Sequence, residues 1–365
     1  MSGKSTLERL ARDQGNYWTG PELAEVEFPP PRWAVPGLIP EGLTFLAGRP
    51  KLGKSWLCWD LALGVATGGT VLGRLPVDQP GDVLYLALED TGRRAQERAL
   101  AVSDGAPLPD RLTVVNQLPR PEEDEGPCPG ETWAEHLIHG WVEAAADPRL
   151  VIVDVLAKVK GQKRIGETDY EADYRQMSGL KTVADRHKVA IVLVHHCRKM
   201  KDEDAFLEVS GSTGLTSCAD TLMVLQRPRR EGWGVTTGVT KSDKEVTDQR
   251  PIVLNITGRD VEESAWVLDW DGDACRFALT DMPPSVARLS GTKQQVVTYL
   301  AAHGPAKPQV IAEVLGIKPN TVTQTCRRLV NERVLDQADG FYLLPLGKSV
   351  TSVTLSPSAD VGVTK

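Results

Sequence analysis

The chain lacks most of the features that mark secreted, membrane-bound or zinc-stabilised proteins. Its 365 residues include six cysteines, which are scattered and form no C-x-x-C pair. Neither a disulfide framework nor a structural zinc site is predicted, which agrees with a reducing compartment. No run approaches the about 18 apolar residues of a membrane span, and the N-terminus has no signal-peptide core. We expect a cytoplasmic protein without a membrane partner.

An excess of positive charge is also missing. Lys and Arg number 42 against 49 Asp and Glu, so the formal net charge is −7. The chain as a whole is therefore not built to bind a polyanion, and any nucleic-acid surface must be local. Composition is that of an ordinary globular protein, with 41% hydrophobic and 25% charged residues. The length allows one large domain and a smaller one.

The most specific pattern present is the P-loop, G-x-x-x-x-G-K-[ST]. It follows a short β-rich stretch, residues 42–47, and precedes an apolar stretch with helical spacing, residues 56–63. In a strand, loop and helix of this kind, backbone N–H groups and the helix N-terminus surround phosphates. The predicted nucleotide-binding residues are Gly48, Arg49, Pro50, Lys51, Leu52, Gly53, Lys54, Ser55 and Trp56. We predict that ATP binds here, with Lys54 on the β- and γ-phosphates and Ser55 on Mg²⁺.

Two acidic residues that close apolar strands are candidates for chemistry at the phosphates. Asp154 ends a run of four aliphatic residues, the arrangement of a Walker B acid, and is the second predicted Mg²⁺ ligand. Glu89 closes the stretch 82–90, a strand that we expect to lie beside the P-loop strand. A carboxylate there can polarise the attacking water, so Glu89 is the predicted catalytic base. Asp90 is the alternative base, although an acid just before Thr91 also suits a helix start.

Two adjacent histidines, His195 and His196, close a further apolar strand, residues 189–196. One of them, with His196 as our candidate, can contact the γ-phosphate and report its loss to the following loop. The alternative is a strand-end histidine that is hydrogen-bonded to the backbone. A zinc role is not predicted, since no other ligand lies at useful spacing.

Strands alternate with helices at the spacing of a mostly parallel α/β sheet. Further strands are predicted over residues 150–154, 221–225 and 234–240, and helices over 93–102, 132–146 and 180–187. Ligands bind at the carboxyl ends of such strands, so the P-loop, Glu89, Asp154 and the histidines should converge. We divide the chain into an extended arm (1–40), an ATPase core (41–280), a linker (281–291), a C-terminal module (292–346) and a disordered tail (347–365).

The C-terminal module reads as a winged helix-turn-helix. Helices are predicted over residues 292–302, 307–315 and 320–333, followed by a hairpin around the turn 337–340. Residues 291–348 carry seven Lys or Arg and four Asp or Glu, a net charge of +3 in an acidic chain. The polar side of the third helix should present Asn320, Thr321, Gln324, Arg327 and Arg328. We expect this module to bind duplex DNA or, alternatively, to dock a replication protein.

Two groups of cations in the core suit nucleic acid or a neighbouring subunit. Basic residues follow Asp154 and the histidines: Lys158, Lys160, Lys163, Arg164, Arg198, Lys199 and Lys201. They either track the backbone of single-stranded DNA or are ordinary solvated side chains. The candidates for a cation inserted into a neighbour's site are Lys241, Arg227, Arg229 and Arg230.

Together these motifs resemble the RecA-like ATPases of the RepA-type hexameric replicative helicase group, the AAA-family ATPases of phages and mobile elements. The resemblance covers about residues 30–255. Its parts are the entry at residues 33–42, the P-loop, the glutamate strand 84–90, the histidine strand and loop 194–199 and 211–214, and the late strand 239–242 with Lys241.

The resemblance implies a homohexameric ring that hydrolyses ATP at subunit interfaces and moves along single-stranded DNA. We therefore predict a helicase-like motor. The alternatives are an ATP-switched DNA-binding regulator that does not unwind DNA, and a recombination or initiation ATPase that forms filaments.

Overall fold

The computed structural model describes residues 17–118, 132–160, 163–196, 206, 217–227, 251–287, 289 and 291–345. The chain divides into two compact units, residues 1–32 and 33–365. In the first unit, helix α2 (Gly20–Glu25) begins where the Glu22 carboxylate accepts the backbone N–H of Thr19 at 2.6 Å. None of the helices in the described parts combines the length and the hydrophobicity that crossing a bilayer requires.

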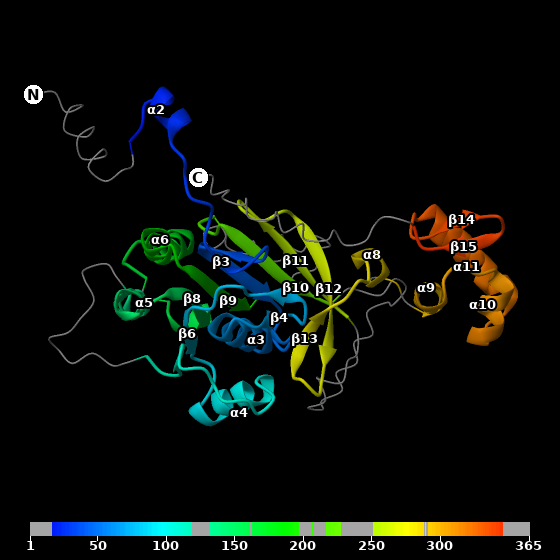
Figure 1. The fold of residues 1–365 in the computed structure, drawn as a ribbon, viewed down its shortest axis with the longest axis horizontal. Coiled ribbons are helices and arrows are strands. Elements are labelled where there is room, and N and C mark those ends of the chain that lie inside the picture. The colour runs from blue at the N-terminus through cyan, green and yellow to red at the C-terminus, as the bar shows by residue number, and fades with distance from the viewer. Residues whose placement is uncertain are drawn as a thin grey trace, which may run out of the picture. The chain divides into compact units, whose positions relative to one another are not determined.

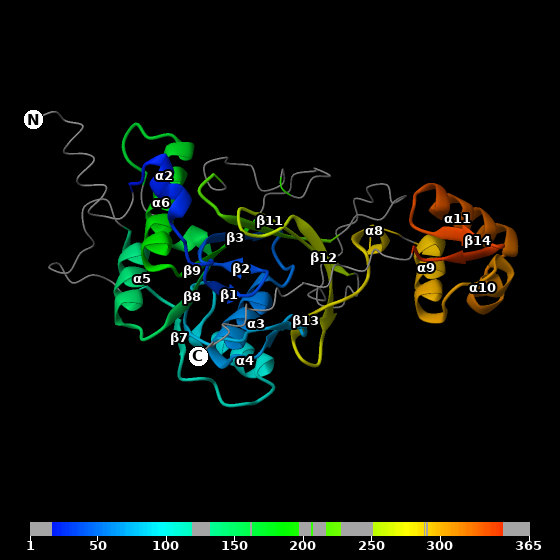
Figure 2. The ribbon, with the colours of Figure 1, turned by 45° about the horizontal axis from the view of Figure 1, so that its top comes forward.

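A nine-stranded sheet forms the centre of the second unit, in the order β13-β12-β11-β10-β3-β9-β8-β6-β7 (Figures 1 and 2). The strands are β3 (Gly42–Gly48), β6 (Asp82–Ala87), β7 (Leu112–Val115), β8 (Pro148–Asp154), β9 (Ala190–His196), β10 (Thr221–Gln226), β11 (Ile252–Gly258), β12 (Ser264–Asp271) and β13 (Arg276–Leu279). Neighbours from β10 to β7 pair in parallel, and β11 to β13 add antiparallel strands. The predicted mostly parallel α/β fold is confirmed.

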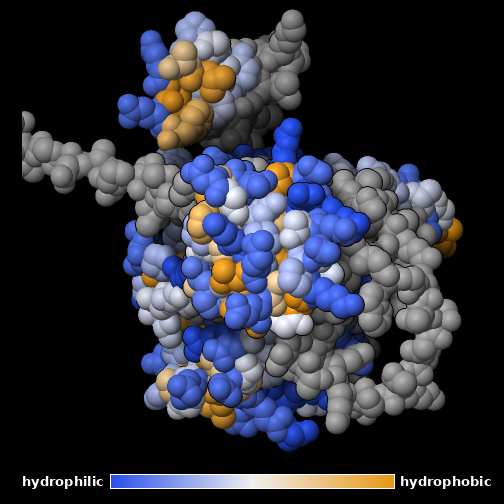
Figure 3. Space-filling model, turned by 90° about the vertical axis from the view of Figure 1, so that its right-hand side faces the viewer, coloured by the Kyte–Doolittle hydropathy of each residue, from blue (hydrophilic) through white to orange (hydrophobic). Residues whose placement is uncertain are grey.

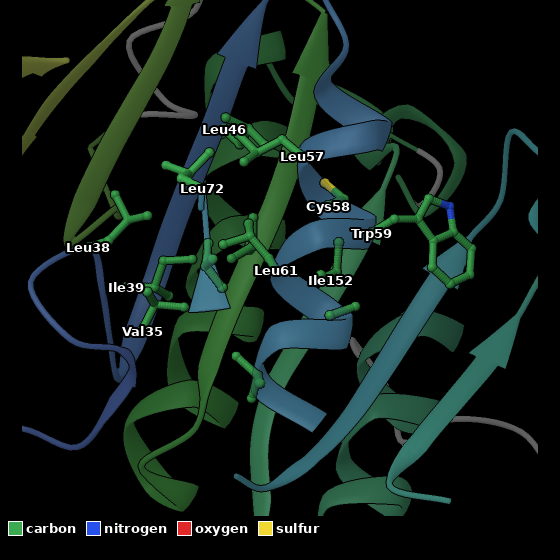
Figure 4. Close-up of a cluster of buried hydrophobic side chains, with 14 of the residues drawn as sticks. Val35, Leu38, Ile39, Leu46, Leu57, Cys58, Trp59, Leu61, Leu72 and Ile152 are labelled. Atoms are coloured by element: carbon green, nitrogen blue, oxygen red, sulfur yellow. The ribbon is translucent and has the colours of Figure 1, made fainter. Parts of the chain in front are cut away.

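Helices cover both faces of the sheet because its inner strands are apolar on both sides. The α3 (Lys54–Thr67) and α4 (Gly92–Val102) side holds one core, with Leu46, Leu57 and Ile152 (Figure 4). The α5 (Trp133–Ala144) and α6 (Asp169–His187) side holds another, built from the alternate strand residues such as Phe45. A short turn η1 (Leu156–Lys158) follows β8. Period-two alternation thus divides each strand between the two cores.

The predicted position of the glutamate strand beside the P-loop strand is wrong. β3 pairs with β9 and β10, and both β9 and β8 lie between β3 and β6. An apolar strand buried on both faces fits several positions in a sheet, so its pattern does not choose its neighbours. β6 also ends at Ala87, which leaves Glu89 in the following turn.

Two segments outside the predicted core contribute buried structure. Residues 33–40, predicted as part of the arm, form β1 (Trp33–Val35) and β2 (Ile39–Pro40), which are antiparallel and reach the α3 core through Val35 and Leu38. Within the predicted core, a second small ribbon consists of β4 (Thr70–Val71) and β5 (Leu75–Pro76). The predicted linker contains α8 (Pro284–Ala287), whose Val286 is buried.

Residues 291–345 contain three helices and a hairpin, the element order expected from the sequence. They are α9 (Gly291–His303), α10 (Pro308–Leu315), α11 (Pro319–Asn331), β14 (Asp336–Ala338) and β15 (Phe341–Leu343). Asp339 and Gly340 form the turn with φ of 50° and 81°, as a two-residue hairpin loop requires. The predicted turn, residues 337–340, is too long, because Gln337 and Ala338 belong to β14 and pair with β15.

Candidate nucleotide site

The loop between β3 and α3 has the tight backbone that its glycines allow. Gly53 has φ of 88°, and a Cβ placed on it would lie 2.6 Å from the ring of Phe277. At Gly48 a Cβ would lie 2.9 Å from the carbonyl oxygen of Leu225. Lys51 also has positive φ, 65°. Both glycines are therefore required by close approach, as in a loop that wraps an anion.

Lys54 is buried at the first turn of α3, where its ammonium group lies within the loop. Its Nζ donates to the carbonyl oxygens of Gly48 at 2.8 Å and Arg49 at 2.9 Å. These contacts hold the loop around the lysine and place its charge where the phosphates of a nucleotide would lie.

Asp154 ends β8 as a buried carboxylate with one oxygen available. Its Oδ2 accepts from the Tyr85 hydroxyl at 3.0 Å, whereas its buried Oδ1 accepts no hydrogen bond from the described residues. Burial raises the pKa of Asp154, and the hydroxyl groups of Ser55 and Tyr85 oppose that rise. An available carboxylate oxygen near the Ser55 hydroxyl fits Mg²⁺, which prefers hard oxygen ligands.

Glu89 meets His196 at the carboxyl edge of the sheet. Its Oε2 lies 3.3 Å from Nε2 of His196, although β6 and β9 are not adjacent. The turn that carries Glu89 is tied to the strand of Asp154, since the Leu88 N–H donates to the Asp154 carbonyl at 2.7 Å. Asp90, the alternative base, is buried and accepts from Arg98 at 2.6 Å. The geometry thus favours Glu89 over Asp90.

The two histidines have different surroundings. The His195 ring packs 5.4 Å from that of Phe45, and its pKa is lowered to about 4 by burial first and then by the charge of Lys160. His195 is therefore neutral at pH 7. His196 is the histidine that contacts Glu89, which favours it as the residue that reports on the phosphate.

A group of aromatic side chains lies beside the P-loop and was not predicted from the sequence. Trp270 on β12 and Phe277 on β13 lie 5.1 Å apart, and Trp270 lies 5.7 Å from Trp56, the residue after Ser55. The guanidinium of Arg98 lies 5.4 Å over the Trp56 ring. The signal in the sequence was the apolar run of residues 265–268, which is typical of a strand, but nothing local indicates that this hairpin reaches the P-loop.

The loop after β8 is less basic than its lysines suggested. Lys160 forms an ion pair with Asp173 on α6. Lys163 and Arg164 are exposed, but the same stretch includes Glu167, Asp169, Glu171 and Asp173. The charge of Lys160 is therefore engaged within the core, and acidic residues follow Lys163 and Arg164 closely in the sequence.

Several predicted residues lie outside the described residues. They are Arg198, Lys199, Lys201, Arg229, Arg230, Lys241, the loop 211–214, the strand 234–240 and the tail from 347.

A family model described as an AAA domain matches residues 8–202, more than half of the chain. The chain belongs to this AAA domain family. Membership implies nucleotide binding, in agreement with the P-loop conformation and with Asp154 and Glu89 at one edge of the sheet. The predicted membership of the AAA-family P-loop proteins is thereby confirmed.

Solved structures resemble this AAA domain protein at low identity. The ATPase domain of G40P is 13% identical with a TM-score of 0.45, over 65% of this chain and 84% of that one. A DnaB-like replicative helicase, determined with its interactions with primase, is 12% identical with a TM-score of 0.45, over 65% and 57%. The RadB recombinase is 14% identical with a TM-score of 0.40, over 66% and 92%. None of the curated proteins matches the chain.

Proposed function

We propose that this AAA domain protein hydrolyses ATP and uses the energy to move along single-stranded DNA. The main support for hydrolysis is the contact between Glu89 and His196. It lies at the same edge of the sheet as Lys54 and the pair Ser55 and Asp154. In the proposed reaction Lys54 exchanges its carbonyl partners for the β- and γ-phosphates. Ser55 and Asp154 would hold Mg²⁺, and the bound ion would neutralise charge on the phosphate oxygens.

Glu89 takes the proton of the attacking water, and its position 3.3 Å from His196 gives the site a way to signal. A γ-phosphate contact would compete with Glu89 for the imidazole of His196. When the phosphate leaves, His196 returns to Glu89, and the end of β9 shifts with it. The loop that follows β9 carries Arg198, Lys199 and Lys201, the residues proposed to hold single-stranded DNA.

The motor is proposed to be a homohexamer in which a neighbouring subunit completes each site. The support is the resemblance of the motifs to the RepA-type group, in which Lys241 matches the residue that acts on the neighbour's nucleotide. Arg227, Arg229 and Arg230 are the alternatives to Lys241.

Unwinding of a forked DNA substrate tests this proposal, with Lys54→Ala as the inactive control. Strand separation that depends on ATP and disappears in Lys54→Ala supports the motor. ATP hydrolysis without strand separation on forks of either polarity would contradict the helicase proposal. An ATP-switched regulator or a recombination ATPase would then be the remaining candidates.

The C-terminal module is proposed to bind duplex DNA through α11. All five of the residues predicted for its polar side are exposed, and Val322, Cys326 and Leu329 are buried on the other side. On the face of the molecule in Figure 3, hydrophilic side chains predominate and hydrophobic ones form small separate groups. A module of this kind also favours the second candidate function, an ATP-switched regulator.

Replacing Arg327 and Arg328 together by Ala tests the module within the full chain. Duplex affinity should fall and its salt dependence should weaken by about two charges, because both arginines would contact phosphates. ATPase activity should not change. The exposed Arg186, at the end of α6, provides the control for loss of a positive charge. Unchanged duplex affinity would make the module a protein-docking domain.

A further inference from the structure

Two tryptophans beside the P-loop are placed to bind the base of the nucleotide. We propose that Trp56 and Trp270 form a stacking subsite for a purine base, an inference that rests on the proposed nucleotide binding at Gly48 to Ser55. Lys54 and Asp154 bear on the phosphates and the metal, and neither explains how the rest of the nucleotide is held.

Trp56 is close in sequence to the residues that would bind the phosphates. It follows Ser55 directly on the first turn of α3. The triphosphate would occupy the loop and the helix N-terminus, so the sugar and base extend past its α-phosphate, over the residues that follow the loop. Trp56 is the first of these residues and is half-buried.

Trp270 reaches the same place from the other end of the core. Its ring lies 5.7 Å from that of Trp56, with 60° between the planes. At this angle neither ring covers the face of the other. Both side chains pack against the α3 core and both remain partly exposed. Each tryptophan therefore keeps part of its ring surface for contact with a flat base.

The pair of tryptophan rings is held in place by its neighbours. The Phe277 ring meets Trp270 edge-to-face, with centroids 5.1 Å apart, and also packs against Gly53 of the P-loop. On the other side, the Arg98 guanidinium lies 5.4 Å over Trp56 and is fixed by Asp90 at 2.6 Å. A preorganised aromatic surface loses little side-chain freedom when a ligand binds.

Stacking predicts which nucleotides bind best. Every base has a π-face, but a bicyclic purine covers more of two tryptophan rings than a pyrimidine does. ATP and GTP should therefore bind more tightly than CTP and UTP. Inorganic tripolyphosphate, which has no base, should depend on the P-loop alone.

Calorimetry on the full chain with Mg²⁺ separates the two subsites. Trp270→Leu and Trp56→Leu should each weaken ATP binding about ten-fold, because base–aromatic stacking is worth about that much, and should leave tripolyphosphate binding unchanged. Trp270→Phe should restore most of the ATP affinity. Trp141→Leu, a half-buried tryptophan of α5 on the opposite face of the sheet, is the matched control and should have no effect.

Two results would overturn the subsite. One is equal loss of ATP and tripolyphosphate affinity, which would mean that the tryptophans only support the loop. The other is unchanged ATP affinity in both variants while the wild type binds ATP. If the wild-type protein binds neither ATP nor tripolyphosphate, the proposed nucleotide site fails as well, and this outcome is distinct from the first two.

Discussion

At the scale of single residues, Glu89 is the side chain on which turnover should depend most. Its carboxylate is half-exposed and contacts the Nε2 edge of the His196 ring, so it can reach a water molecule. Glu89→Gln should retain ATP binding and lower the rate of hydrolysis by about a hundred-fold or more, because the amide cannot accept the proton. Binding measured by calorimetry and phosphate release measured in the same preparation check this.

The control for Glu89→Gln is Glu97→Gln on α4, an exposed carboxylate that pairs with Arg93 and lies outside the proposed site. It should hydrolyse ATP at the wild-type rate. Turnover retained in Glu89→Gln would move the base elsewhere, with Asp90 first to be tested despite its bond to Arg98.

Asp60 makes stability depend on pH. It is buried in the middle of α3, where it accepts the Leu72 N–H at 2.8 Å. Burial raises its pKa from 3.8 to about 6, and the Leu72 N–H and the Arg276 charge oppose that rise. Because the folded pKa is the higher one, the native state binds this proton more tightly than the unfolded state. The resulting stability is fully present below pH about 3.8 and is lost as pH rises through about 6.

Asp60→Asn should remove that pH dependence. The amide oxygen still accepts from Leu72 but carries no charge to bury. As pH rises from 4 to 8, the unfolding free energy of the wild type should fall by about 1 to 3 kcal/mol more than that of the variant. Urea denaturation at several pH values measures this, with the exposed Asp78→Asn as control. Parallel pH profiles for Asp60→Asn and wild type would contradict the assignment.

At the scale of elements, the hairpin of β12 and β13 contacts the P-loop through Phe277. Gly53→Ala combines an unfavourable positive φ with overlap of the buried Phe277 ring, so it should cost about 2 to 4 kcal/mol and abolish ATP binding. Gly105→Ala has a similar φ, 73°, but no described atom lies within 4 Å of its Cβ. It should cost about 1 kcal/mol and leave ATP binding unchanged.

Thermal denaturation and nucleotide titration of the two glycine variants separate backbone strain from overlap. Equal destabilisation would show that strain alone matters and that Phe277 yields at no cost.

Several elements were predictable, whereas the strands β7, β11, β12 and β13 and the order of the strands in the sheet were not. Apolar runs and helical spacing located β8, β9, β10 and α4 to within a few residues. The sequence did not indicate that β9 and β8 separate β6 from β3, because such strands are buried on both faces wherever they lie. The contact of Glu89 with His196 depends on that order.

At the scale of the whole molecule, the proposed shared site predicts that two inactive variants can complement one another. Glu89→Gln inactivates the half of the site that contains the P-loop, and Lys241→Ala inactivates the half that the neighbouring subunit contributes. In a mixture, about a quarter of the interfaces would pair an intact Glu89 with an intact Lys241, if subunits assemble at random. ATPase activity should therefore reappear on mixing.

A mixture of Glu89→Gln and Lys54→Ala is the matched control. Both residues belong to the P-loop half of a site, so no interface would be complete and activity should stay absent. If subunits exchange but Glu89→Gln and Lys241→Ala do not complement, Lys241 does not act on a neighbour.

The sequence by itself determined the class of this AAA domain protein. A glycine loop between a strand and a helix, with acids at later strand ends, is local chemistry that can be read along the chain. The tertiary structure alone decided which side chains meet at that loop. Trp270 and Phe277 come from more than 200 residues downstream of Ser55, and Glu89 reaches His196 only because β6 and β9 end at one edge. Such contacts arise from packing between distant segments, which local patterns do not encode. The P-loop of residues 48–55 needed only the sequence to be found, and the wall of aromatic residues beside it needed the fold.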